Sequence, residues 1–165
     1  MIDTLLDAIG DSAVGMFVAE NATAFPWIEV IHVLGIVVVF GSILLVDLRL
    51  MGLAARDYPA LTFSRTILPV TWTAFIVAVV TGALMFASNP HGYFGNTMFR
   101  VKMLLLLAAG LNMLVFHLIT MRGGRMTDGP GPLPGGARMA GLFSLTLWLA
   151  IIACGRWIGF TMAPF

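Results

Sequence analysis

The stretch PWIEVIHVLGIVVVFGSILLVDLRL, residues 26–50, decides the fold class. It has no charged side chain from Val33 to Val46, and its polar residues gather near its two ends. An apolar run of about 20 residues with few charges is long enough to cross the hydrocarbon core of a bilayer as a helix. The sequence therefore predicts a transmembrane helix here.

Three further stretches have the same character, at 66–87, 99–120 and 139–160. The chain of 165 residues is 59% hydrophobic and only 10% charged, against about 25% charged residues in an ordinary soluble domain. We expect an all-α protein, an integral membrane four-helix bundle formed by residues 26–165. Its first expected partner is the lipid bilayer.

Residues 1–25 carry acids and no basic residue, so they lack the positive start of a secretory signal and are expected to stay attached. Ile2, Leu5, Leu6 and Ile9 recur at helical spacing with acids between them. That pattern is typical of a short amphipathic helix at the membrane interface. We expect this N-terminal segment to lie on the bilayer.

Basic residues flank the first and third connections, and such residues mark the cytoplasmic side of a membrane. Both termini and the connection around His91 are then expected on the periplasmic side of a bacterial inner membrane. The third connection, RGGRMTDGPGPLPGGAR, is rich in glycine and proline and predicts a flexible cytoplasmic loop. The flanking basic residues are Arg49, Arg56, Arg65, Arg122, Arg125 and Arg138.

Several classes of function find no support in the composition. Net charge +1 without a basic cluster gives no case for nucleic acid as a partner. Cys154 is the only cysteine, which excludes an internal disulfide and a cysteine metal cluster. No nucleophile triad, general acid–base pair or nucleotide fingerprint is present, so a stand-alone enzyme is not expected.

Two histidines, His32 and His117, lie inside the apolar stretches, where an ionisable residue is by default a candidate functional residue. Glu29 precedes His32 by one turn on the same helix face. This Glu-x-x-His spacing occurs once, whereas di-metal carboxylate bundles use it twice. His32 is expected to be an axial haem or copper ligand with Glu29 near the metal, or else an inward histidine bonded to Glu29 or to a carbonyl.

One metal cannot hold both in-span histidines. At about 1.5 Å per residue, His32 and His117 are separated by roughly 18 Å along the membrane normal. A metal near the periplasmic side could take His32 with His91 from the second connection, or with Met85 as a softer ligand. An ordinary exposed loop histidine is an equal reading of His91, and a second ligand for His117 could be Met51, Met121 or a neighbouring subunit.

Three cations are placed near the same side of the bundle. Arg156 interrupts the fourth apolar stretch, and Arg100 and Lys102 begin the third. Each is a candidate for binding haem propionates, and Arg156 could also neutralise Glu29. The alternative for Arg156 is an extended side chain that reaches the headgroups.

Four segments carry a resemblance to known proteins: WIEVIHVLGIVVVFGSILLVDLRLMG, the TG in VVTGALMF, NTMFRVKMLLLLAAGLNMLVFH and GRWIGF. From Trp27 onward the chain resembles a family of short bacterial four-helix membrane proteins. That family is similar in layout to the membrane part of copper-resistance D proteins and to small b-type cytochromes. By this resemblance His32 and His117 match the family's in-span histidines. Two-haem members use four histidine ligands, whereas this chain has three, so at most one bis-histidine haem per chain is implied.

The expected function is a b-type haem-binding electron-transfer subunit, part of a larger redox complex with other membrane or periplasmic subunits or with further copies of itself. One alternative is a membrane transporter of copper or another small solute. Another is a cofactor-free interaction subunit whose histidines are structural.

Overall fold

The computed structural model describes residues 1–55, 57–116, 118, 133 and 135–162, and these form an all-helical protein. The described helices are α1 Ile2–Gly10, α2 Ala13–Glu20, α3 Ala24–Met51, α4 Ala60–Ser88, α5 Pro90–Gly95, α6 Thr97–Val115 and α7 Gly135–Met162. Four are long and apolar enough to cross a membrane: α3, the Thr62–Ser88 part of α4, α6 and α7. The predicted four-helix membrane bundle is therefore confirmed.

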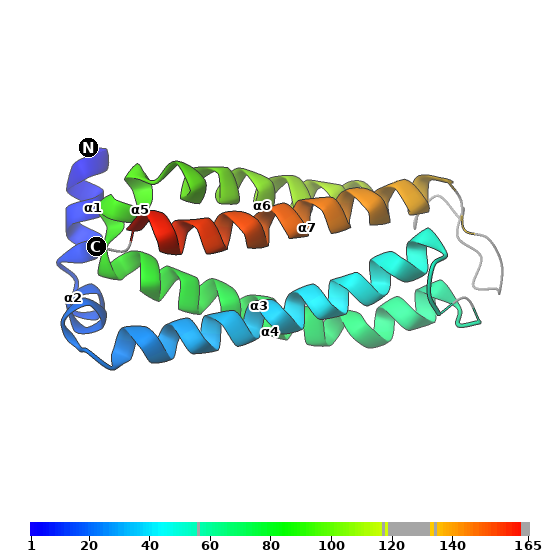
Figure 1. Cartoon of the computed structure of the whole chain (residues 1–165), viewed down its shortest axis with the longest axis horizontal. Coiled ribbons are helices and arrows are strands. Elements are labelled where there is room, and N and C mark those ends of the chain that lie inside the picture. Colours follow the sequence, from blue (N-terminus) through cyan, green and yellow to red (C-terminus); the bar gives the residue numbers. More distant parts are fainter. Residues whose placement is uncertain (56, 117, 119–132, 134, 163–165) are drawn as a thin grey trace.

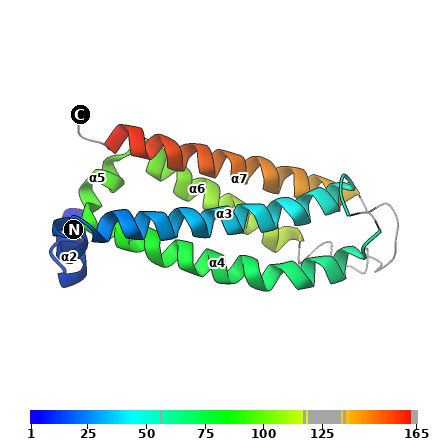
Figure 2. The ribbon, with the colours of Figure 1, turned by 60° about the horizontal axis from the view of Figure 1, so that its bottom comes forward.

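The four long helices form two antiparallel pairs. Helices α3 and α4 pack along each other, α6 packs on α7, and α3 joins the pairs through α7. Figure 1 shows α1, α2 and α5 gathered at the end of the bundle where the chain begins. Figure 2 shows this end, again on the left, after a rotation about the horizontal axis. We call this the amino-terminal end and the other, which carries Arg49, the Arg49 end.

The long helices bury few side chains against one another, and their outward faces are apolar. No residue of α6 is buried, and Leu104 and Leu107 are 66% and 63% exposed. In water such faces would be costly, whereas lipid tails cover them without loss of hydrophobic free energy. The exposed leucines indicate contact with a bilayer.

The N-terminal segment folds as two helices, α1 and α2, where one was expected. Ser12 separates them because its hydroxyl oxygen accepts a hydrogen bond from the Gly15 N–H at 3.0 Å, which caps the start of α2. The hydroxyl also donates to the Ile9 carbonyl at 2.6 Å. Leu6 of α1 and Val18 of α2 are buried, so both helices are attached to the bundle through apolar side chains.

The second connection, which carries His91, contains the short helix α5. Asn89 caps it by accepting a hydrogen bond from the Gly92 N–H at 3.0 Å, and Pro90 occupies its first turn. Proline fits that position because its missing N–H is one that a helix start leaves unpaired. The Asn-Pro pair was the signal in the sequence that could have predicted this helix.

Small residues permit close approach inside the bundle. A Cβ atom on Gly35 would lie 3.4 Å from the Ala74 carbonyl and 3.5 Å from the Ala78 Cβ. Ala74 and Ala78 of α4 thus serve packing inside the bundle. On α7, by contrast, a Cβ at Gly159 would meet nothing within 4 Å.

The tightest approach between α3 and α7 is at Gly141, where a Cβ would lie 3.0 Å from the Asp47 carbonyl and 3.2 Å from the Leu50 Cβ. We expect Gly141→Val to destabilise the protein by about 1–3 kcal/mol, because extra carbons in a packed contact force the two helices apart. Thermal unfolding in detergent, followed by tryptophan fluorescence, measures the effect. Gly159→Val on the same helix is the control, and an equal melting temperature for both variants would contradict the prediction.

Candidate functional site

His32 lies half-buried on α3 and faces α4. Its Nδ1 lies 3.0 Å from the Thr81 hydroxyl oxygen, and its ring covers Gly82, where a Cβ would come within 3.1 Å of Cε1. The Thr81 hydroxyl donates its single proton to the Val77 carbonyl at 2.7 Å. With that proton directed to Val77, the Thr81 oxygen is available as an acceptor for an Nδ1–H of His32, which is the tautomer that leaves the lone pair on Nε2.

Lys102 of α6 completes a polar cluster with His32 in the amino-terminal half of the bundle. Its ammonium lies beside α7, 3.6 Å from where a Cβ on Gly155 would stand. Its charge acts on the His32 imidazole. One cation is thus held near His32 by the packing of three helices.

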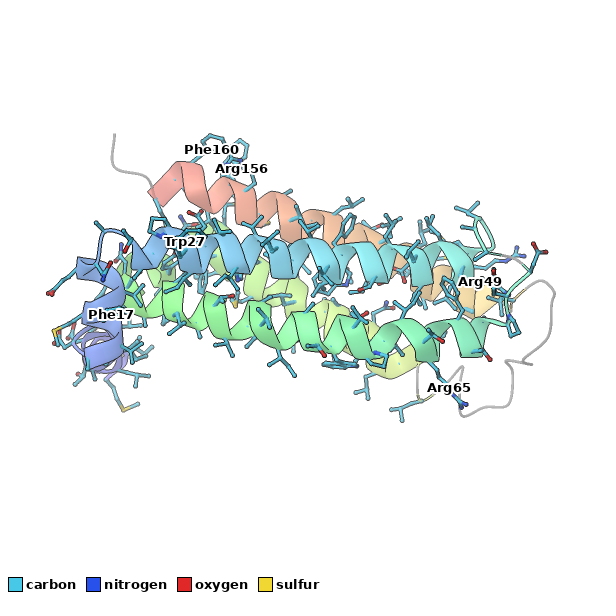
Figure 3. The ribbon with its side chains drawn as sticks, turned by 90° about the horizontal axis from the view of Figure 1, so that it is seen from below. Phe17, Trp27, Arg49, Arg65, Arg156 and Phe160 are labelled. Atoms are coloured by element: carbon cyan, nitrogen blue, oxygen red, sulfur yellow. The ribbon has the colours of Figure 1, made fainter. Side chains whose placement is uncertain are left out.

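The two arginines expected beside Lys102 have other surroundings. Arg156 is exposed, and its guanidinium carbon lies 4.5 Å from the centre of the Phe160 ring, on the outer face of α7 (Figure 3). Arg100 is also exposed, and it donates to the Thr97 hydroxyl at 3.4 Å. Of the three expected propionate partners, Lys102 is the one whose charge acts on His32.

Glu29 and His91 each face a different neighbour. Glu29 is exposed, and its charge acts on Tyr93 of α5, whose pKa is raised mainly by burial and further by that charge. His91 is exposed on α5, where its Nε2 lies 2.7 Å from the Asp7 carboxylate of α1. The expected sharing of one metal by His32 and His91 stays a prediction, and within the described residues His91 serves the contact between α1 and α5.

The other residues predicted as metal ligands are not gathered around His32 in a metal-binding group among the described residues. Among the described residues, no three His, Cys, Asp or Glu side chains lie together as a metal-binding group. His117 and Met121 lie outside the described residues. Met85 is partly buried near the end of α4.

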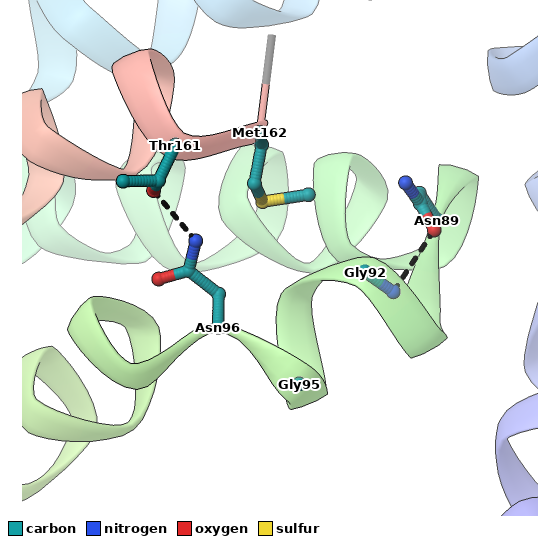
Figure 4. A pocket seen from close by; sticks show the side chains of 6 residues that line it. All are labelled: Asn89, Gly92, Gly95, Asn96, Thr161 and Met162. Atoms are coloured by element: carbon teal, nitrogen blue, oxygen red, sulfur yellow. Dashed lines mark hydrogen bonds between the residues drawn. The ribbon is translucent and has the colours of Figure 1, made fainter. Parts of the chain in front are cut away.

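An open pocket of about 390 Å³ lies at the amino-terminal end. Figure 4 shows two hydrogen bonds beside it, from Asn96 Nδ2 to the Thr161 hydroxyl at 2.7 Å and from the Gly92 N–H to Asn89 at 3.0 Å. Asn96 also accepts from the first N–H groups of α6. No titratable side chain lines the pocket, so its polar groups position helix ends.

A second cavity, of about 220 Å³, lies between the four long helices in the half of the bundle toward the Arg49 end. Its walls are mostly apolar and include the rings of Trp72, Phe75 and Trp148. Phe75 meets each tryptophan edge to face, with ring centres 5.9 and 6.5 Å apart. The cavity is therefore an aromatic chamber inside the membrane part of the protein.

One carboxyl group opens into this chamber. Asp47 lines the cavity and is 4% exposed. Within the part of the chain that the structure describes, its Oδ2 atom has no hydrogen-bond partner, while Ser144 of α7 is near enough to hydrogen-bond the carboxyl group. Asp47 thus retains a free acceptor position in an apolar interior.

The comparison with protein families matches residues 4–161 to a family of unknown function, DUF6644. The chain belongs to the DUF6644 family. No curated protein and no solved structure matches it. Membership in DUF6644 adds no assignment of haem or copper chemistry, so the function of this DUF6644 chain has to be argued from its own residues.

Asp47 is a functional candidate that the sequence did not single out, because it lies beside Arg49 at the end of the first span, where charged side chains commonly fix a helix end. Arg49 does have that role: it is buried, and its Nε donates to the Tyr58 carbonyl at 2.8 Å. Asp47 instead shares a helix face with Val39 and Ile43, which also line the cavity. That shared face was the available signal.

Proposed function

We propose that this DUF6644 protein is a membrane-embedded b-type haem-binding subunit that transfers electrons within a larger redox complex. The observation that carries the proposal is the contact between His32 Nδ1 and the Thr81 hydroxyl oxygen at 3.0 Å. A histidine that ligates a metal through Nε2 normally donates its other N–H to a nearby acceptor, which fixes the ring's tautomer and orientation. Thr81 is such an acceptor for His32.

The surroundings of His32 fit a haem ligand in two further respects. The ring is held against Gly82, where any side chain would displace it. Lys102 supplies a positive charge close to the ring, and cationic side chains bind propionate carboxylates through charge-assisted hydrogen bonds. A haem bound there would supply one-electron transfer, while the protein would orient the axial ligand and compensate the propionate charge.

The same proposal includes an orientation in the bacterial inner membrane with both termini in the periplasm. The distribution of charge supports it: Arg49 and Arg65 lie at one end of the bundle (Figure 3), and the acids of α1 lie at the other. Basic residues favour the cytoplasmic side. His32 then lies in the periplasmic half.

The test is a reduced-minus-oxidised absorption spectrum of the full chain, purified in detergent from cells supplied with haem precursor. We expect the bands of a b-type haem, with haem and protein in a fixed ratio. A folded, monodisperse preparation without these bands would overturn the proposal.

A further inference from the structure

We propose that the cavity between the four long helices binds a lipid-soluble phenol, meaning an apolar aromatic ring that bears a hydroxyl donor, and that Asp47 accepts the hydrogen bond from this hydroxyl. The proposal goes beyond the haem and does not rest on it. His32 lies in the amino-terminal half of the bundle, whereas Asp47 lies near the other end of the same helix.

The first support is the unmatched acceptor. Asp47 Oδ2 is buried and has no hydrogen-bond partner among the described residues. A buried polar atom without a partner is costly, and native proteins pair nearly all of them. The neighbouring cation does not supply the pair: Arg49 directs its Nε to the Tyr58 carbonyl, and its Nη2 is itself buried without a hydrogen-bond partner among the described residues. A donor carried by a ligand would satisfy Asp47.

The second support is the chemistry of the walls. Ligand sites are typically apolar chambers with a few polar groups that fix the orientation of the ligand. Here Trp72, Phe75 and Trp148 form one aromatic wall, and such rings favour a further ring packed at an angle or offset. This lining favours an aromatic body over an ion.

The third support is that Thr71 and Asn112, two other polar side chains that line the cavity, donate hydrogen bonds within the protein. Thr71 donates to the Ser42 oxygen at 2.8 Å, and Ser42 donates to the Val39 carbonyl at 2.9 Å. Asn112 donates to the Ala140 carbonyl at 3.0 Å. These groups form bonds within the protein, so the carboxyl of Asp47 is left as the acceptor for a ligand.

The probe for the test is thymol, compared with thymol methyl ether, which keeps the ring and the alkyl groups but has no hydroxyl donor. Binding of each to the full chain in detergent micelles is measured by isothermal titration calorimetry, with empty micelles as the blank. We expect saturable binding of thymol and about five-fold or more weaker binding of the ether, because the buried Asp47 oxygen is then left without a hydrogen-bond donor. Equal affinities would overturn the proposal.

A pair of variants tests Asp47 itself. Asp47→Asn keeps the size of the side chain but replaces one carboxyl oxygen with an amide N–H donor, and is expected to weaken thymol binding about five-fold or more. Asp57→Asn, an exposed acid in the connection after α3, is the matched control and should bind thymol as the wild type does. Unchanged binding by a folded Asp47→Asn would also overturn the proposal. If that variant fails to fold, the comparison of thymol with its ether on the wild-type chain still decides. The haem spectrum is a separate measurement, so failure of either proposal leaves the other standing.

Discussion

Replacing His32 with alanine is expected to reduce the haem content of the purified protein to background. An axial histidine supplies the bond between the protein and the iron, and alanine has no atom that can replace Nε2. The measurement is the b-type absorbance per mole of protein. The largest effect should come from this single side chain, because it is the described imidazole that lies within a span.

Two further variants separate a ligand role from a structural one. His91→Ala removes an exposed imidazole whose Nε2 is bonded to Asp7; retention of haem in this variant would assign the site to His32 without His91. Thr81→Val removes the acceptor for Nδ1 and should weaken haem binding about 10- to 100-fold without abolishing it. If His32→Ala kept its full haem content, His32 would not be the ligand.

Gly15→Ala is expected to separate α2 from the end of α4. A Cβ atom there would lie 2.6 and 2.7 Å from the carbonyl oxygens of Gly10 and Ile9 and 2.8 Å from that of Ala87. These three oxygens belong to the backbone and cannot move aside as the end of a flexible side chain can, so α2 itself must move. Overpacking of this kind costs about 1–3 kcal/mol, which corresponds to an increase of about 5- to 150-fold in the population with α2 detached.

The displacement of α2 can be measured by cysteine labelling. In a Cys154→Ala background, a cysteine in place of Val18, which is 2% exposed, should react with a maleimide about ten-fold faster when Gly15 is alanine. Gly10→Ala is the matched control, because a Cβ there would meet Pro90 at an ordinary 3.5 Å. Equal labelling rates in the two variants would show that α2 tolerates the added carbon.

The sequence predicts much of the architecture because lipid imposes one strong requirement on the chain. Each span must satisfy its own backbone hydrogen bonds and present apolar side chains outward, so length and hydropathy alone reveal it. Helix ends are harder to place, since they depend on local capping. The Ser12 cap divides the N-terminal segment into two helices, and the Asn89 cap starts a short helix in the second connection. The apolar pattern indicates neither.

For the candidate site as well, the sequence predicts which residue is polar within a span but not which residues it contacts. That His32 is polar at membrane depth follows from its position in the sequence, and this was enough to select it. Two features of its surroundings depend on how the helices are rotated about their axes. One is the contact of His32 with Thr81 on α4, and the other is that the charge of Lys102, and not that of Arg156, acts on His32. Hydropathy fixes no such rotation, because the apolar faces toward lipid and toward protein are alike in composition.

The sequence by itself thus determined a four-span, all-helical membrane protein with an apolar N-terminal attachment and two candidate histidines within its spans. Only the tertiary structure decided which face of α3 points inward and therefore that Asp47, two residues before Arg49, opens into an aromatic cavity while Arg49 holds the end of the helix. The reason is physical: hydrophobic burial is non-directional and can be read along a chain, whereas hydrogen bonds and cavities exist only where particular side chains from several helices meet.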